Sequence, residues 1–193
     1  MSLRERLRIH DVSTLAEDWS VLKKTRLSFR RRDGTWQEQW RETYDRGDGA
    51  VILLYNRARR TVLLTRQFRY PAYVNGHDDL MIEAPAGLLD RAAPEARIRA
   101  EVAEEAGVLV GRVEMLMDVF MSPGSVTERL HFFIGSYEPE DRIGPGGGCA
   151  EEGEDIGVIE MTIDAALDAI RTGGIRDGKT IILLQHAALH IFR

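Results

Sequence analysis

The stretch AGLLDRAAPEARIRAEVAEEAGV, residues 86–108, joins a glycine loop to a strongly acidic segment. Pro94 suits the first turn of a helix and Gly107 suits the residue after its last turn, which predicts a helix between them. Ile98 and Val102 lie one turn apart on this helix and would face a hydrophobic core. The stretch therefore predicts a helix that packs against the rest of the chain by one face.

Three glutamates share one flank of this helix, beside its apolar face. At about 100° per residue, Glu101 and Glu105 adjoin the core and Glu104 lies further round. No Lys or Arg follows them one turn later, and Arg97 precedes Glu101 in the weaker orientation for a helical ion pair. Burying unpaired carboxylates is costly, and a bound Mg²⁺ would offset that cost. From the helix alone, a metal site and a solvated charged face are equally open.

Length, charge and cysteine content narrow the class of protein. The 193 residues fit one domain with an N-terminal extension, and a net charge of −5 argues against a broad nucleic-acid surface. The longest apolar runs, such as residues 51–54, are too short to cross a membrane. A charged start does not resemble a signal peptide, and Cys149 alone excludes an internal disulfide. We expect a cytoplasmic protein.

The order of patterns along the chain predicts an α+β fold, with a mixed sheet packed against helices. Asp33-Gly34 and residues 56–60 are typical of hairpin turns. Two further helices are expected at residues 163–171 and 180–191, and the Gly- and acid-rich residues 138–155 predict a mobile surface loop. Strands are expected at residues 19–29, 37–45, 50–55, 61–68, 80–84, 113–121, 129–137 and 156–161.

Residues 86–108 resemble the Nudix box, in which a glycine loop precedes a helix that ends in Glu-x-x-Glu-Glu-x-Gly. The flanking motifs look like the nucleoside-diphosphate-sugar hydrolases of the Nudix superfamily. Within that branch, the sequence is most similar to the GDP-mannose pyrophosphatases. The superfamily branch rests on RQFR (66–69), EAPAGLLD (83–90), SPGSVTE (122–128) and IRDGKT (175–180), and the narrower likeness on YDRGDGAVILLYN (44–56), Val74-Asn75-Gly76 and the GGG…EDI stretch.

The resemblance implies a Nudix fold over residues 47–193, with a mixed sheet sandwiched between helices. It also implies an N-terminal antiparallel β extension over residues 1–46 that forms a homodimer. The implied reaction is hydrolysis of the pyrophosphate of a nucleotide sugar, with Mg²⁺ as cofactor and Mn²⁺ as a substitute. Neither a nucleic acid nor a membrane is an expected partner.

The implied substrate is GDP-mannose, which would give GMP and mannose 1-phosphate. ADP-ribose, giving AMP and ribose 5-phosphate, is the nearest alternative, because related enzymes share several of the motifs. Ala93 and Ala100 replace a Glu and an Arg that brace the loop against the helix in most family members. A non-catalytic nucleotide sensor is therefore a lesser alternative.

The same resemblance implies the site residues. Glu101, Glu105, Glu154 and the backbone carbonyl of Ala86 would bind the metal. Glu104, Glu105 and Glu154 would be catalytic, and Glu154 would be a distal metal ligand or general base on the mobile loop. Substrate contacts are implied for Trp19, Trp40, Arg41, Glu42, Arg69, Ala86, Gly87, Leu88, Glu128, Gly153 and Lys179.

Two other motifs are rejected. Residues 173–180 match the letters of a P-loop, but the preceding segment is predicted to be a helix, where a P-loop requires a strand. His186 and His190 lie one turn apart, but Ala187 occupies the position where a zinc protease has a Glu.

Overall fold

The computed structural model describes residues 2–193, apart from the side chain of Glu152, and divides them into two compact units. The first unit contains residues 2–48 together with Phe120–Arg129. The second contains Gly49–Val119 and Leu130–Arg193, and it holds the acidic helix.

The first unit is built on a three-stranded antiparallel sheet in the order β1-β2-β3, preceded by the short 3-10 turn η1 (Arg4–Arg6). β2 (Val21–Arg30) and β3 (Trp36–Asp45) form the hairpin predicted at Asp33-Gly34, where the Asp33 carboxylate accepts hydrogen bonds from the backbone and side chain of Thr35. β1 (Leu7–Glu17) was not predicted. Two register shifts break its pairing with β2, and they also disrupt the regular alternation that would mark a strand.

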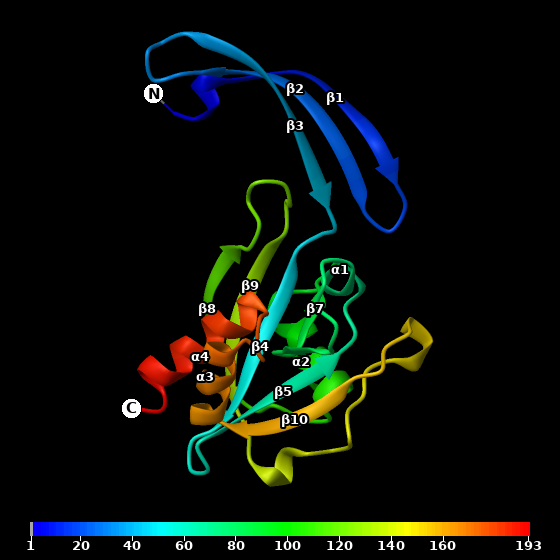
Figure 1. Cartoon of the computed structure of the whole chain (residues 1–193), viewed down its shortest axis with the longest axis vertical. Helices are drawn as coiled ribbons and strands as arrows, with labels where there is room; N and C mark the ends of the chain where they lie inside the picture. The colour runs from blue at the N-terminus through cyan, green and yellow to red at the C-terminus, as the bar shows by residue number, and fades with distance from the viewer. Residues whose placement is uncertain (1) are drawn as a thin grey trace. The chain divides into compact units, whose positions relative to one another are not determined.

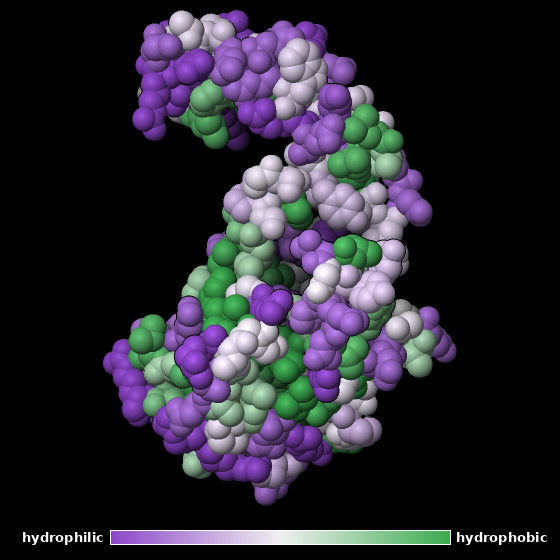
Figure 2. All heavy atoms as spheres, in the orientation of Figure 1, coloured by the Kyte–Doolittle hydropathy of each residue, from purple (hydrophilic) through white to green (hydrophobic). Residues whose placement is uncertain are grey.

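This first sheet has no hydrophobic core of its own. None of residues 2–48 is buried. Figure 2 shows apolar atoms scattered over the otherwise hydrophilic surface of this unit. The exposed apolar side chains on it include Leu3, Ile9, Val12, Leu15, Trp19, Trp36 and Trp40.

The second unit contains a mixed sheet in the order β10-β5-β4-β9-β8. β4 and β9 pair in parallel, while β4 pairs antiparallel with β5, and β5 with β10. Two short strands extend this sheet, since β6 pairs with β5 and β7 with β4. The predicted α+β class with a mixed sheet is confirmed. The strands are β4 (Gly49–Asn56), β5 (Thr61–Gln67), β6 (Met81–Glu83), β7 (Ala86–Leu88), β8 (Val113–Phe120), β9 (Arg129–Ser136) and β10 (Gly157–Thr162).

Helices cover both faces of this sheet (Figure 1). α2 (Pro94–Ala106) packs Ile98 and Val102 against Ile52 and Leu54 of β4. Neighbouring strand residues point to opposite faces, so Val51 and Leu53 are buried on the other side, where α4 contacts β4. This double burial explains the continuous apolar run in β4. The predicted late helices are α3 (Ile163–Thr172) and α4 (Gly178–His190).

α3 directly precedes the glycines of the P-loop pattern, so the reason for rejecting that motif is confirmed. His186 and His190 lie on α4 with ring centroids 4.5 Å apart. None of the helices in residues 2–193 is both long and apolar enough to cross a membrane.

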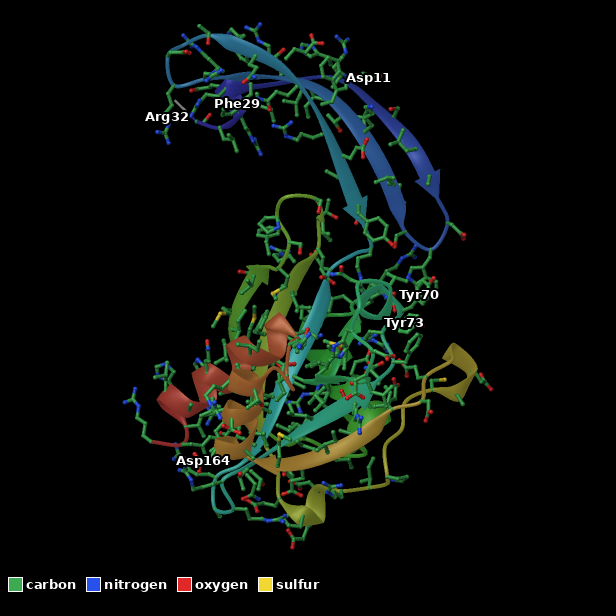
Figure 3. All side chains as sticks on the ribbon, viewed as in Figure 1. Asp11, Phe29, Arg32, Tyr70, Tyr73 and Asp164 are labelled. Carbon is green, nitrogen blue, oxygen red and sulfur yellow. The ribbon has the colours of Figure 1, made fainter. Side chains whose placement is uncertain are left out.

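The short helix α1 (Tyr70–Val74) was also not predicted. It has five residues, too few for a helical period to appear in the sequence. Its Tyr70 and Tyr73 rings lie close together, with centroids 6.5 Å apart (Figure 3). Phe68 completes this exposed aromatic cluster beside Arg69.

The packing of α2 on β4 makes a prediction for stability. Replacing the fully buried Leu54 with Ala should lower the free energy of unfolding by about 2–5 kcal/mol, because a cavity is left in a packed core. Leu189→Ala is the control, because Leu189 is exposed on α4 and its loss should change stability by less than about 0.5 kcal/mol. Urea unfolding followed by circular dichroism measures both. Equal effects of the two substitutions would contradict this account of the core.

Candidate active site

Two of the three glutamates on α2 are buried. Glu101 is 5% exposed and Glu105 is 2% exposed, whereas Glu104 is exposed to solvent. Glu101 and Glu105 therefore do not belong to a solvated charged face of the helix. The sequence prediction that Glu105 lies next to the core is confirmed, and Glu101 is nearly as deep.

Both buried carboxylates face the backbone of β7. The amide of Ala86 donates a hydrogen bond of 3.2 Å to Oε2 of Glu105. Gly87 lies so close to Glu101 that a Cβ at this position would overlap the carboxylate. The glycine is therefore required by the close approach of strand and side chain.

Arg97 balances the charge of Glu101, although the sequence indicated a weak orientation for this pair. Its guanidinium lies 2.5 Å from Oε1 of Glu101 and also donates to the backbone carbonyl of Leu88 at 3.1 Å. One side chain thus ties the helix to β7.

Glu105 has no comparable cationic partner at hydrogen-bonding distance in the described contacts. Burial and repulsion from Glu101 raise its pKa to about 8, and the hydrogen bond from Ala86 only partly opposes them. Glu154 adds to the repulsion, and Arg69 reduces it. The carboxylates of Glu101 on α2 and of Glu154 on the later loop thus both raise the pKa of Glu105.

A second charged cluster centres on Glu83, at the end of β6. This carboxylate is 3% exposed and accepts three hydrogen bonds from Arg69, at 2.8–3.2 Å, and one from Lys179 at 3.2 Å. Burial opposes its ionisation, but the charges of Lys179 and Arg69 outweigh burial and hold the pKa of Glu83 below its usual value. Arg69 and Lys179, two of the predicted substrate-binding residues, are therefore brought together by one acid.

Glu83 was not among the site residues predicted from the sequence. The only sequence feature that could have pointed to a role for Glu83 is its position at the start of the EAPAGLLD motif. The partner Lys179 is 96 residues away in sequence, so no local pattern could reveal the pair.

The start of α4 is fastened to this cluster. The Asp177 side chain caps the helix by accepting from the amide and hydroxyl of Thr180, and it also accepts from Lys179 at 2.9 Å. The Thr180 hydroxyl in turn accepts from the amide of Ala84 at 2.7 Å. The DGKT and EAPAG motifs are thus joined by direct contacts.

Glu154 lies on the loop that follows α2 and β9 along the chain. Its Oε2 accepts a hydrogen bond of 2.8 Å from the amide of Cys149. The sequence predicted a mobile surface loop here, and the glycines that precede Glu154 are hydrogen-bonded to α2 in the structure. The amides of Gly147 and Gly148 donate to the carbonyls of Glu105 and Glu104, which fastens this part of the loop to α2.

Several predicted substrate residues belong to the first unit. Trp19 is largely exposed, and Trp40 is about half exposed on β3. The guanidinium of Arg41 donates to Gln39 and to the carbonyl of Trp40. Glu42 pairs in register with Lys24, and Glu128 lies 3.6 Å from Arg46. The second unit supplies Arg69, Ala86, Gly87, Leu88, Glu101, Glu104, Glu105, Gly153, Glu154 and Lys179.

The buried pair on α2 fits a divalent cation. Within the part of the chain that the structure describes, no three or more His, Cys, Asp or Glu side chains form a ready-made ligand group. Mg²⁺ commonly uses only one or two carboxylates and completes its coordination with water and phosphate oxygens. Glu101 and Glu105 offer such a pair, and the raised pKa of Glu105 indicates that a nearby positive charge would be favourable.

Comparison with known proteins identifies similar sequences over nearly the whole chain. The family model described as GDP-mannose pyrophosphatase NudK N-terminal domain matches residues 6–44, and the NUDIX domain model matches residues 45–184. GDP-mannose pyrophosphatase of Pectobacterium atrosepticum is 53% identical over 91% of this chain and 90% of its own length. The enzyme of the same name from Klebsiella pneumoniae is 49% identical over 93% and 91%.

A solved structure shares the fold. The crystal structure of an ADP compounds hydrolase superposes with a TM-score of 0.73, covering 95% of this chain and 93% of that one. Its sequence is 15% identical, so the likeness concerns the fold alone.

The raised pKa of Glu105 predicts how the stability of the metal-free protein depends on pH. The folded protein holds the proton of Glu105 more tightly than the unfolded chain, in which the pKa is near 4.5. This residue's contribution to stability is therefore complete below about pH 4.5 and is lost as pH rises towards 8. Glu105→Gln stays neutral and should remove this part of the decline.

Thermal melts in EDTA between pH 5 and 8 compare the wild-type protein with this variant. Glu95→Gln is the control, because Glu95 is an exposed acid on the same helix. A decline that persists unchanged in Glu105→Gln would show that the carboxyl of Glu105 is not its source.

Proposed function

This chain belongs to the NUDIX family and is a hydrolase, and we propose that it cleaves the pyrophosphate of GDP-mannose with Mg²⁺ as cofactor. Water and GDP-mannose would give GMP and mannose 1-phosphate, as one phosphorus–oxygen bond of the bridge is replaced by a bond to the water oxygen. The two hydrogens of the water end on the two new phosphate groups, or are released as these groups ionise. The expected Nudix fold is confirmed. Hydrolases of this family generally require a divalent metal, and the choice of Mg²⁺ over Mn²⁺ is part of the proposal.

The observation that carries the proposal is the buried pair of carboxylates against β7. Two carboxyl groups are held beside the glycine strand at 5% and 2% exposure. Arg97 balances the charge of Glu101, whereas ionisation of the buried Glu105 is unfavourable unless a further cation balances it. The relatives named GDP-mannose pyrophosphatase support the substrate, because they are about half identical over nine-tenths of this chain.

Glu101, Glu105 and the carbonyl of Ala86 would hold the metal, with Glu154 as a distal ligand or general base. A bound Mg²⁺ supplies neutralisation of the pyrophosphate oxygens and activation of a water. Glu104 is exposed and is proposed to orient this water or to join the ligands from its more open position.

Arg69 and Lys179 would bind the phosphate oxygens. Both donate to Glu83, which fixes them on one side of the site before any substrate arrives. Because these cations are held in advance, less conformational freedom is lost when the pyrophosphate binds. Further substrate contacts are proposed for Trp19, Trp40, Arg41, Glu42, Gly87, Leu88, Glu128 and Gly153.

ADP-ribose is the second candidate substrate. The structural relative that acts on ADP compounds is 15% identical, so it does not favour that substrate over GDP-mannose. The sensor alternative is weakened by Arg97, since this residue ties α2 to β7 despite Ala93 and Ala100.

The activity prediction concerns Glu105. Glu105→Gln should lower kcat by more than about 100-fold, because even residues that only support metal ligands cost about 10- to 100-fold when replaced. Glu95→Gln, on the same helix and exposed, should keep full activity. Chromatography of the products from GDP-mannose and from ADP-ribose, with Mg²⁺ and with excess EDTA, measures the loss and the preference. Full activity of Glu105→Gln, or of the wild-type protein in EDTA, would refute the metal assignment.

We further propose that residues 1–46 form a homodimer contact. A three-stranded sheet without a buried residue is marginal by itself, and its exposed apolar side chains call for a covering surface. A second copy of the chain is the proposed cover. We also propose a cytoplasmic location, which suits a protein whose Cys149 is unpaired.

The dimer prediction is tested by light scattering at micromolar concentration. The wild-type mass should be twice 21.8 kDa. Ile9→Lys should shift it towards the monomer, because a charge would replace an apolar contact. Leu189→Lys is a matched control in the second unit, as both side chains are 62% exposed. A wild-type monomer would overturn the proposal.

A further inference from the structure

The loop after η2 (Pro139–Asp141) is attached to the last turn of α2 by backbone hydrogen bonds. The amide of Gly147 donates to the carbonyl of Glu105 at 3.0 Å, and that of Gly148 to the carbonyl of Glu104 at 3.1 Å. The amide of Ile143 donates to the carbonyl of Gly107 at 2.8 Å. The last carbonyls of a helix have no partner within it, so the loop satisfies them. The same residues that carry the acidic side chains thus also anchor the loop.

Glycine is sterically required at the points of closest approach. A Cβ on Gly146 would overlap the backbone carbonyl of Glu105, and one on Gly107 would overlap that of Gly144. Both glycines also have a left-handed backbone, with φ of +70° and +65°. The loop and the helix end therefore pack backbone against backbone.

Gly148 plays a different part, because its neighbour is Glu154. A Cβ on Gly148, whose φ is +77°, would overlap the carboxylate of Glu154 and lie 2.9 Å from that residue's own Cβ. The carboxylate is held there by the amide of Cys149, and Ile156 donates to the carbonyl of Gly147 at 3.1 Å. Glu154 thus occupies the space that a side chain at position 148 would fill.

We propose that Gly146 and Gly148 are positioning residues that fix the carboxylate of Glu154 relative to Glu104 and Glu105. Because Gly146 has no side chain, the loop backbone can contact the end of α2. Because Gly148 has none, the carboxylate of Glu154 can occupy the adjacent space. The hydrogen bonds from Gly147 and Gly148 then connect the two acidic segments directly. This inference rests on the proposed role of Glu154 in metal binding or catalysis.

The wild-type protein gives a first test, by hydrogen exchange. The amides of Gly147 and Gly148 should exchange with deuterated water as slowly as those in the last turn of α2, since both donate to that turn. Exchange at the rate of a free loop would overturn the proposal without any substitution.

The second test is a double-mutant cycle of Gly148→Ala and Glu154→Gln. Each single variant should weaken Mn²⁺ binding to the substrate-free protein, measured by titration calorimetry, and lower kcat, by about 10- to 100-fold. If Gly148 acts through Glu154, then adding Gly148→Ala to Glu154→Gln should change neither quantity further. Additive losses would show that Gly148 acts by another route and would overturn the proposal.

Two alanine variants serve as controls. Gly144→Ala lies in the same loop, where a Cβ meets nothing within 4 Å and no left-handed backbone is needed. Gly173→Ala, at the end of α3, adds a comparable backbone strain at φ +82° with only an ordinary contact to Arg176. Both should keep wild-type Mn²⁺ affinity and kcat, and thermal melts separate strain from positioning.

The experiments distinguish the proposed role of Glu154 from the positioning role of Gly148. If Glu154→Gln binds Mn²⁺ and turns over normally, the proposed role of Glu154 is wrong and the positioning inference falls with it. If Glu154→Gln is impaired but Gly148→Ala behaves like Gly173→Ala, only the positioning inference is wrong.

Discussion

The burial of two acidic side chains on one helix is the constraint on which the rest of the second unit depends. Glu101 and Glu105 lie on the side of α2 that faces β7, where water cannot screen them well. Each neighbouring feature reduces this cost: Arg97 pairs with Glu101, and the Ala86 amide binds Glu105. Glu105 nevertheless keeps a pKa of about 8, so part of the cost persists in the protein alone. That remaining cost is the physical reason to expect a cation there.

Charge balance also organises the cluster around Glu83. The buried Glu83 is compensated by Arg69, which directly precedes α1, and by Lys179, which lies at the start of α4. Removing either cation would leave a buried acid partly unpaired, so these residues stabilise the fold as well as serving as candidate phosphate ligands. The two clusters are complementary, since one offers carboxylates for a metal and the other offers cations for an anion. A metal-bound pyrophosphate needs both.

The two units obtain their stability by different means. The second unit buries both faces of β4 under α2 and α4, which gives it a continuous core. Within residues 2–48 the first unit has hydrogen-bonded strands and exposed apolar side chains, and none of these residues is buried. The β2–β3 hairpin follows from its strand-forming residues and its Asp33-Gly34 turn. These local signals specify the strands but not the surface that covers them.

The sequence by itself determined the family, the α+β class, the extent of α2 and the nearness of Glu101 and Glu105 to the core, because helical period and motif spacing are local properties. It did not show β1, whose register shifts break its alternation, or α1, which is too short for a period. Only the tertiary structure decided which charges are paired. Lys179 reaches Glu83 across 96 residues, and the glycines fasten to the end of α2 through backbone atoms that carry no sequence signal. Such contacts depend on chain folding in three dimensions, which is why the predicted mobile loop proved to be anchored at its glycines.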